Sequence, residues 1–240
     1  LQQAEEAGRR GVEPPPVLDA PPVVLAGGTV LTATGQEHSP GYVVLRDGKV
    51  QAVGAGEPPA VDGATVLDVS GQYVTPGLID THSHLGVYPS PYAHAHSDGN
   101  EATAPTTPGV WAEHSVWPQD PGFQRAMAGG ITAMQILPGS ANLVGGRGYV
   151  IHNVPTRGSR AMRFPGAPET VKMACGENPK RVYGGKGGAP STRMGNLRGQ
   201  RAAYARAREY AAEWSRWADK HEHQVRRYEK QQAKLERKGR

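Results

Sequence analysis

The chain has 240 residues, a formal net charge of +5 and a single cysteine, Cys175. This length allows one large or two small domains with a hydrophobic core. One cysteine excludes an intrachain disulfide and a four-cysteine metal site, and its apolar neighbours predict a small buried residue. Between Lys220 and Arg240, eight Lys or Arg against three Glu account for the whole net charge, so the remainder does not support a nucleic-acid-binding surface. No apolar run approaches the ~18 residues of a membrane span, so no membrane partner is predicted.

The N-terminal part is expected to contain a lead-in and a small β domain. Residues 1–21 are polar and then proline-rich, which is typical of an extended segment. Residues 22–74 hold short β-branched runs separated by turns, at residues 23–25, 28–32, 42–46, 50–53 and 65–69. Asp47-Gly48, between two of these runs, favours a type I′ hairpin because both residues accept a positive φ.

Two histidines one residue apart, His82 and His84, end the next apolar run. If residues 78–84 are extended, both imidazoles point to one face and Ser83 to the other, and Asp80 shares the face of the histidines. Neutral imidazoles suit Zn, Fe, Ni or Mn, and a hydrolytic site needs three or four protein ligands with one position left for water. The pattern predicts a metal site.

His94 and His96 repeat the spacing, but Pro and Gly around them favour a loop. Between residues 84 and 123 the chain shows little periodicity and many prolines, which predicts a long loop that either covers a substrate or is held in place by its aromatic residues. Loop histidines are more often solvated than metal-bound, so the first pair is the stronger candidate.

Residues 123–129 predict a short helix that ends at Gly129-Gly130 and leads into a strand at residues 131–137. Two more strand-like runs follow, at residues 149–154 and 170–175. The glycines between 139 and 148 match no phosphate-binding pattern. From residue 199 onward, apolar residues recur at spacings of three and four, which indicates a long helix that packs through its first half and ends as a basic solvated tail.

Residues 74–86 (VTPGLIDTHSHLG) resemble the signature of the metal-dependent amidohydrolase superfamily, and further segments resemble its imidazolonepropionase-like or prolidase-like branch. These segments are DGNE at 98–101, WAEH at 111–114, DPGF at 120–123, AGGIT at 128–132, LPGSAN at 137–142, KMACGENPKRVYG at 172–184 and PSTRMG at 190–195. The resemblance covers roughly residues 22 to 215.

The resemblance implies an α/β fold: residues 75–198 as the first half of a (β/α)8 barrel, residues 22–74 as part of a small β-sandwich, and residues 199–240 as the long helix. A whole barrel takes ~250 residues, and only about four barrel strands are expected here. We therefore expect a second polypeptide to supply the C-terminal half of the barrel, because an open half would expose a sheet edge. A higher oligomer is also expected.

The resemblance also implies one or two divalent metals, Zn first and Mn or Fe as alternatives. Lys172 lies inside an apolar strand, where a charged amine is costly, and it matches the family position of a carboxylated lysine that bridges two metals. Glu177 is the alternative bridging ligand, and a structural lysine paired with Glu101 or Glu177 stays open. The catalytic aspartate of the family would lie on the missing strands, so no catalytic residue is assigned here.

The expected reaction is attack of metal-activated water on a C–N bond of an amide, cyclic amide or dipeptide-like substrate, with this chain inactive alone. Tyr88, His114 and Arg147 are candidate substrate contacts, and Arg163 and Arg193 are, like Arg147, candidates for binding a substrate carboxylate. The alternatives are a ring deaminase of the same superfamily and a non-catalytic scaffold whose basic helix binds a partner. The start at Leu1 fits a processed terminus, and the compartment stays open between the cytoplasm and export.

Overall fold

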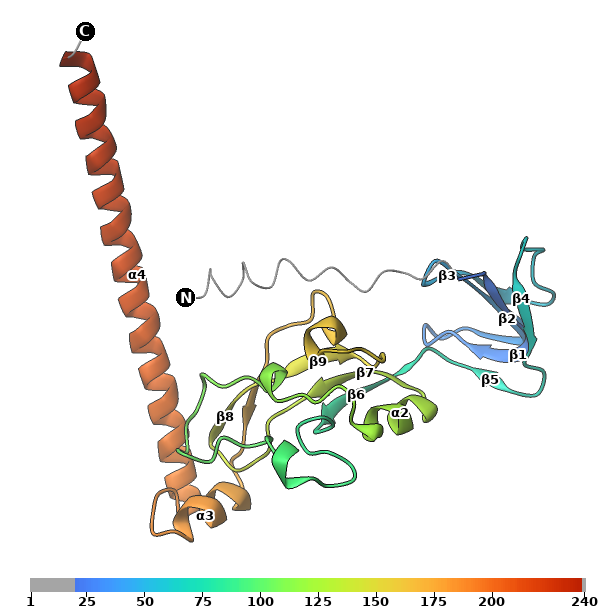
Figure 1. The fold of residues 1–240 in the computed structure, drawn as a ribbon, viewed down its shortest axis with the longest axis horizontal. Coiled ribbons are helices and arrows are strands. Elements are labelled where there is room, and N and C mark those ends of the chain that lie inside the picture. The colour runs from blue at the N-terminus through green and yellow to red at the C-terminus, as the bar shows by residue number, and fades with distance from the viewer. Residues whose placement is uncertain (1–19, 239–240) are drawn as a thin grey trace. The chain divides into compact units, whose positions relative to one another are not determined.

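The computed structural model describes residues 20–238. It divides into two compact units, each treated separately below. In its described part, unit 1 comprises residues 20–98, 112–137 and 148–169, and unit 2 comprises residues 99–111, 138–147 and 170–238. The lead-in predicted at residues 1–21 lies almost wholly outside the described residues. Figure 1 shows the fold.

A five-stranded sheet forms the first part of unit 1. Its strands are β1 (Val23–Leu31), β2 (Glu37–Arg46), β3 (Lys49–Ala55), β4 (Thr65–Asp68) and β5 (Tyr73–Val74). β1 pairs antiparallel with β2 and parallel with β4 and β5, while β2 pairs antiparallel with β3. Asp47 and Gly48 both have positive φ, which confirms the predicted hairpin turn. The runs predicted as separate strands around residue 27 form one strand, because Gly27 and Gly28 introduce a register shift rather than a break.

The second sheet of unit 1 has the order β6-β7-β9. Its strands are β6 (Leu78–Ser83), β7 (Ile131–Ile136) and β9 (Tyr149–His152). β6 and β7 are parallel, whereas β7 and β9 are antiparallel. Parallel strands need a long crossover connection, which usually contains a helix. In this sheet the described connection from β6 to β7 contains a helix, whereas the connection from β7 to β9 contains none.

The antiparallel direction of β9 corrects the strand count predicted for the barrel. Neighbouring strands of a (β/α)8 barrel are all parallel, so β9 cannot be the barrel strand next to β7. In unit 2, β10 (Val171–Met173) pairs antiparallel with β8 (Val144–Arg147). β8 was not predicted, because two of its four residues are glycines, which have low strand propensity. Within residues 20–238 the fold is thus mixed α/β, with one parallel strand pair in the second sheet.

The core of unit 1 lies around β7 and β9. Met134 and Ile136 of β7 and Ile151 of β9 are fully buried. They belong to one apolar cluster with Tyr149 of β9 and with residues from the long loop, α2 (Pro121–Ala128) and η3 (Ser159–Met162), namely Val87, Ala112, Val116, Phe123 and Met162. The long loop is therefore packed into the core at several points, and it also contains the single-turn helices η1 (His94–His96) and η2 (Ala112–His114).

α2 begins two residues before the predicted start, at Pro121. The Asp120 carboxylate caps it by accepting a hydrogen bond from Gly122 N–H, and proline is favoured at the first helical position. Gly130 has a φ of +86°, a conformation that suits glycine at the end of a helix. The predicted glycine stop is confirmed.

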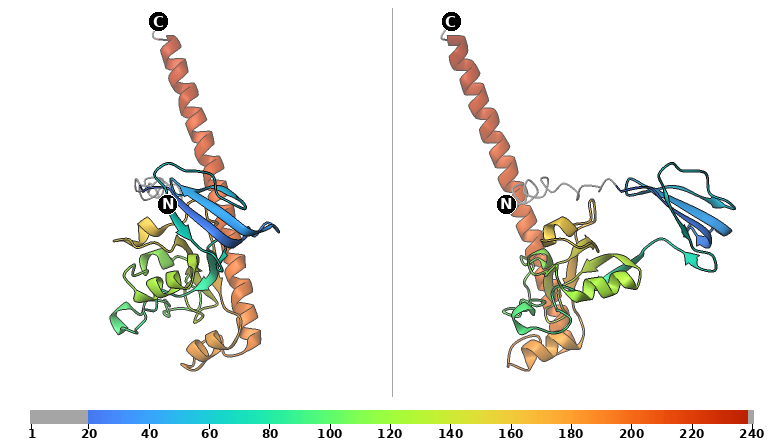
Figure 2. Two further views of the ribbon diagram at one scale, coloured as in Figure 1. Left: turned by 90° about the vertical axis from the view of Figure 1, so that its right-hand side faces the viewer. Right: turned by 45° about the vertical axis from the view of Figure 1, so that its right-hand side comes forward.

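Unit 2 contains α3 (Glu177–Gly184) and the long helix α4 (Arg193–Lys238). α4 is continuous in every view and begins six residues before the predicted start (Figures 1 and 2). Cys175, between β10 and α3, is exposed, so the expectation of a buried cysteine was wrong: the apolar strand ends at Met173. Among the described helices, none has the length and apolar character that crossing a bilayer requires.

Candidate metal site at the end of β6

His82 and His84 lie close together where β6 ends. Their ring centroids are 5.2 Å apart with the ring planes nearly perpendicular. Ser83 between them is buried while His82 is exposed, as expected for alternating side chains of a strand. β6 ends at Ser83 and His84 is the first residue beyond it, at the carboxyl end of the strand. Active sites of open and closed α/β sheets lie at this end.

A backbone carbonyl orients the His84 ring. His84 Nδ1 is 2.8 Å from the carbonyl oxygen of Leu137, which can only accept, so Nδ1 carries the hydrogen and donates it. The N–H of the same residue, Leu137, donates a hydrogen bond to Ser83 O of β6. This bond holds Leu137, and with it the carbonyl that accepts from His84, against the strand. In the neutral imidazole with its hydrogen on Nδ1, Nε2 has a lone pair for a ligand bond. This arrangement is typical of a histidine that binds a metal through Nε2.

Tyr88, a predicted substrate contact, lies against the same ring. The rings of His84 and Tyr88 are 5.7 Å apart in an edge-to-face arrangement. Burial raises the pKa of the Tyr88 hydroxyl, so this side chain is a neutral hydrogen-bonding group at neutral pH.

The turn that follows the histidines is fixed by Asp120, which the sequence did not single out. Its carboxylate is buried and accepts hydrogen bonds from the N–H groups of Gly86 (2.9 Å), Ser90 (3.1 Å) and Gly122 (2.8 Å). It therefore ties the turn after β6 to the start of α2. The only local signal was the Asp-Pro dipeptide before a helix, which indicates a cap but not the remote contacts.

Asp80, which precedes the histidines on β6, contacts the backbone of its own strand. Asp80 Oδ1 accepts a hydrogen bond from the backbone N–H of His82 at 3.0 Å. This carboxylate therefore holds the backbone of its own strand at the position where His82 begins to point outward.

The second histidine pair is in a different setting. His94 and His96 are exposed and belong to the single turn η1. With three residues per turn, side chains two positions apart point about 120° away from each other around such a helix. His96 instead stacks on Trp117, with ring centroids 4.6 Å apart. Spacing alone therefore does not define a site, and the local backbone decides which pair can share a ligand.

Lys172 and Glu177, the predicted bridging ligands, belong to unit 2, whereas the histidine pair belongs to unit 1. Lys172 lies on β10 opposite Gly146 and is only 7% exposed, and burial lowers its pKa. Glu177 begins α3, is exposed and forms an ion pair with Arg181 at 3.0 Å. Within residues 20–238, no group of three or more His, Cys, Asp or Glu side chains lies together as a metal site would require.

The other predicted substrate contacts are engaged elsewhere or exposed. In unit 2 the Arg147 guanidinium lies over the ring of Trp111, 4.4 Å from its centroid. In unit 1 His114 is an exposed residue at the end of η2. Arg147 thus belongs to a different unit from the histidine pair, and its predicted substrate contact stays a prediction, as does that of His114.

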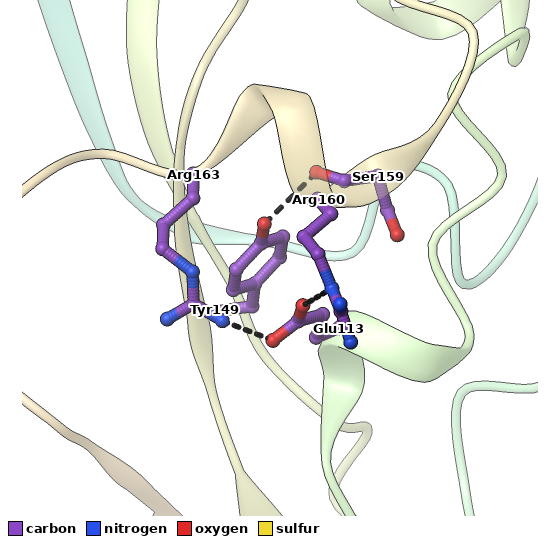
Figure 3. A network of polar contacts seen from close by, with 5 residues as sticks. All are labelled: Glu113, Tyr149, Ser159, Arg160 and Arg163. Atoms are coloured by element: carbon purple, nitrogen blue, oxygen red, sulfur yellow. Dashed lines mark hydrogen bonds and ion pairs between the residues drawn. The ribbon is translucent and has the colours of Figure 1, made fainter. Parts of the chain in front are cut away.

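Arg163 belongs to a polar network with Glu113, Tyr149, Ser159 and Arg160, which is shown in Figure 3. It forms an ion pair with the buried Glu113, whose second oxygen is 3.6 Å from Arg160. Tyr149 donates its hydroxyl hydrogen to Ser159 O at 2.8 Å, and its ring lies under the Arg163 guanidinium. Burial and the negative charge of Glu113 raise the pKa of Tyr149 to about 12. Arg163 therefore holds η2 and η3 to the sheet, and the prediction that it contacts substrate stays untested.

Comparison with known proteins finds amidohydrolases that are similar to this chain. No protein-family model matches it. It is 37% identical over 166 residues to "Amidohydrolase tasK" of Hapsidospora irregularis, covering 65% of this chain and 17% of that protein. It is 46% identical over 48 residues to an imidazolonepropionase of Streptococcus sanguinis, covering 19% of this chain and 11% of that protein.

A solved amidohydrolase from Thermotoga maritima has the same fold over most of this chain. The TM-score is 0.72 with 39% sequence identity, over 80% of this chain and 49% of that one. These relatives confirm the resemblance to the amidohydrolase superfamily that the sequence predicts, and the match fits the predicted N-terminal half. The chain spans about half the length of the Thermotoga protein and 17% of tasK.

Proposed function

We propose that this chain carries the first metal-binding strand of a hydrolase that cleaves C–N bonds of amides, cyclic amides or dipeptide-like substrates. The observation that carries the proposal is the His82–His84 pair at the carboxyl end of β6, with the Nδ1 of His84 held by the Leu137 carbonyl. The names of the similar proteins, amidohydrolase and imidazolonepropionase, support the class of reaction.

The two imidazoles suit a divalent cation, with Zn first and Mn or Fe as alternatives. Neutral nitrogen donors are the ligands these ions prefer, and a bound ion would activate a water molecule for attack on the carbonyl carbon. In this scheme His82 and His84 bind the ion and Leu137 O holds the His84 ring in place. Tyr88 shields one side of the ring from water.

The remaining parts of the proposed site lie beyond this strand. We propose that carboxylated Lys172, or Glu177 in its place, completes the ligand set, since burial favours the neutral amine that reacts with carbon dioxide. Further histidines and the general base would come from a second polypeptide that completes the barrel. The chain is then inactive alone and gains activity on assembly, and mass spectrometry under native conditions should show the mass of bound carbon dioxide on Lys172.

Calorimetric titration of the 240-residue chain with zinc tests the central claim. We expect His82→Ala/His84→Ala to weaken zinc binding at least about tenfold, because both nitrogen donors are lost. His94→Ala/His96→Ala removes the same two side chains at the same spacing and should leave the affinity within about twofold. If the second double variant causes the loss and the first does not, the proposed site is wrong.

A further inference from the structure

The long helix α4 is held in unit 2 only near its start. Asn196 donates hydrogen bonds to Cys175 O and Gly176 O, and Gln200 donates to Ala174 O. The helix also passes close to Leu143 at Gly199. A Cβ at this position would lie 2.3 Å from the Leu143 side chain. From Arg206 onward, every α4 residue whose burial is described is exposed. A helix of 46 residues is about 69 Å long, so most of its length has no packing partner in the described chain.

Large aromatic side chains line one side of this exposed length. We define the aromatic seam as Tyr210, Trp214, Trp217, His221 and Tyr228. The first four rings contact one another in sequence, at centroid distances of 6.1, 5.4 and 5.1 Å, so they share one face. Tyr210, Trp217 and Tyr228 are more than half exposed and Trp214 is 41% exposed. Contiguous exposed aromatic area of this kind marks an interaction surface.

The spacing of the seam is that of a coiled coil. Its members are separated by four, three, four and seven residues, so they occupy a and d positions of heptads from Tyr210 (d) to Tyr228 (a). The e positions beside them are Tyr204, Ala211, Ala218 and Val225, which widen the apolar stripe. Side chains with this repeat pack into the holes of a second helix rather than onto a flat surface.

The charges that border the seam indicate which helix fits. The g positions are Arg206, Glu213, Lys220 and Arg227, three basic and one acidic. Over the whole of α4, thirteen Lys or Arg stand against six Asp or Glu. A second copy of α4 would bring two strongly basic helices together, whereas a helix with Glu or Asp at its e and g positions would pair with the basic g residues.

From this we infer that α4 binds an acidic amphipathic helix of a partner protein along the aromatic seam, as a heteromeric coiled coil. This inference is independent of the proposed hydrolase activity, since it uses only the exposed half of α4. It gives the scaffold role of the basic helix a defined surface and a defined partner chemistry.

Calorimetry with synthetic helical peptides tests the inference on the 240-residue chain. The acidic probe has about four heptads with Leu at a and d and Glu at e and g, and the control probe has Lys in place of Glu. We expect the acidic peptide to bind at least roughly tenfold more tightly than the basic one, with an affinity that falls as salt rises. Equal affinities for the two peptides, or binding of neither, would overturn the inference.

Matched variants locate the surface. Lys220→Glu/Arg227→Glu reverses two charges beside the seam and should weaken the acidic peptide at least about tenfold. Arg216→Glu/Arg226→Glu makes the same change in net charge at c and f positions, away from the seam, and should have less than about a threefold effect. Equal losses of affinity for the acidic peptide in the two variants would show nonspecific charge attraction and would overturn the inference. Self-association of the chain that disappears in Trp214→Ser/Trp217→Ser would make a second copy the occupant, and would also overturn the inference.

Discussion

The core around β7 and the aromatic seam of α4 use their side chains in opposite ways. In unit 1 even charged groups are buried with partners: Glu113 contacts two arginines and Asp120 accepts three backbone hydrogen bonds. On α4 even the largest apolar groups are exposed, as Trp217 is at 56%. The comparison indicates that the fold around the histidines is stabilised within the chain, whereas the described residues of the outer half of α4 are exposed and have no packing partner among residues 20–238.

The largest difference is expected between two carboxylate–arginine pairs. Glu113→Gln leaves the charge of Arg163 without its buried counter-ion and should lower the free energy of unfolding by about 3 kcal/mol. Glu222→Gln on α4 breaks an exposed pair with Arg226, whose side chains are both more than 60% exposed, and should cost at most about 0.5 kcal/mol. Urea unfolding at neutral pH measures both.

A double variant separates the lost attraction from the stranded charge. Glu113→Gln/Arg163→Met removes both charges and should recover more than half of the loss, because an apolar side chain of similar length replaces the unpaired guanidinium. Equal losses for Glu113→Gln and Glu222→Gln would contradict the contrast between the two regions.

The next effect concerns the support of the histidine turn. Asp120→Ala leaves the buried N–H groups of Gly86 and Gly122 and the partly buried N–H of Ser90 without their acceptor, and it removes the cap of α2. We therefore expect a loss of about 2 kcal/mol and weaker zinc binding at the histidine pair. Asp219→Ala, an exposed carboxylate on α4, should change stability by less than about 0.5 kcal/mol. Unchanged zinc affinity in folded Asp120→Ala would show that the turn does not position the histidines.

Local patterns in the sequence predicted the elements that local physics controls. The alternation around Ser83 predicted the histidine pair, and the Gly129-Gly130 stop predicted the α2-to-β7 step. The hairpin at Asp47-Gly48 followed from the conformations these residues allow. Each of these depends on residues within a few positions of one another.

Features set by remote contacts were missed. The antiparallel direction of β9 cannot be predicted from its own residues, because the side chains of a strand alternate in the same way whether it pairs parallel or antiparallel. The Asp120 contacts with Gly86 and Ser90 span more than 25 positions, and the Leu137 carbonyl that orients His84 lies 53 positions away. A backbone acceptor has no residue-type signal, so no motif could have predicted it.

A smaller effect depends on pH. Tyr149→Phe removes the hydrogen bond to Ser159 O and should cost about 1 kcal/mol at neutral pH. The pKa of Tyr149 rises from 10.0 to about 12 on folding, so between these values the folded chain keeps a proton that the unfolded chain has lost. Stability therefore falls as the pH rises through this window, by up to about 1.4 kcal/mol per pH unit, and Tyr149 contributes no slope below it.

Urea midpoints between pH 9 and 11 measure the stabilities of wild type and Tyr149→Phe. This range reaches into the lower part of the window between the two pKa values, about where tyrosine begins to ionise. The wild-type curve should fall more steeply than that of Tyr149→Phe. Tyr210→Phe, an exposed tyrosine on the seam, should stay within about 0.5 kcal/mol of wild type at neutral pH. Parallel pH curves for wild type and Tyr149→Phe would mean that Tyr149 is not protected by burial beside Glu113.

The smallest effect on stability is expected where the most apolar surface is removed. Trp214→Ser/Trp217→Ser should change the free energy of unfolding by less than about 0.5 kcal/mol, because both residues are exposed, Trp214 at 41% and Trp217 at 56%, and Trp and Ser have similar helix propensities. Met134→Ala, in the core of unit 1, removes a smaller side chain and should cost about 2 to 5 kcal/mol. A loss above about 1 kcal/mol for the tryptophan variant would mean that the seam packs against its own chain. The contrast between the two regions would then fail, because both would be stabilised from within.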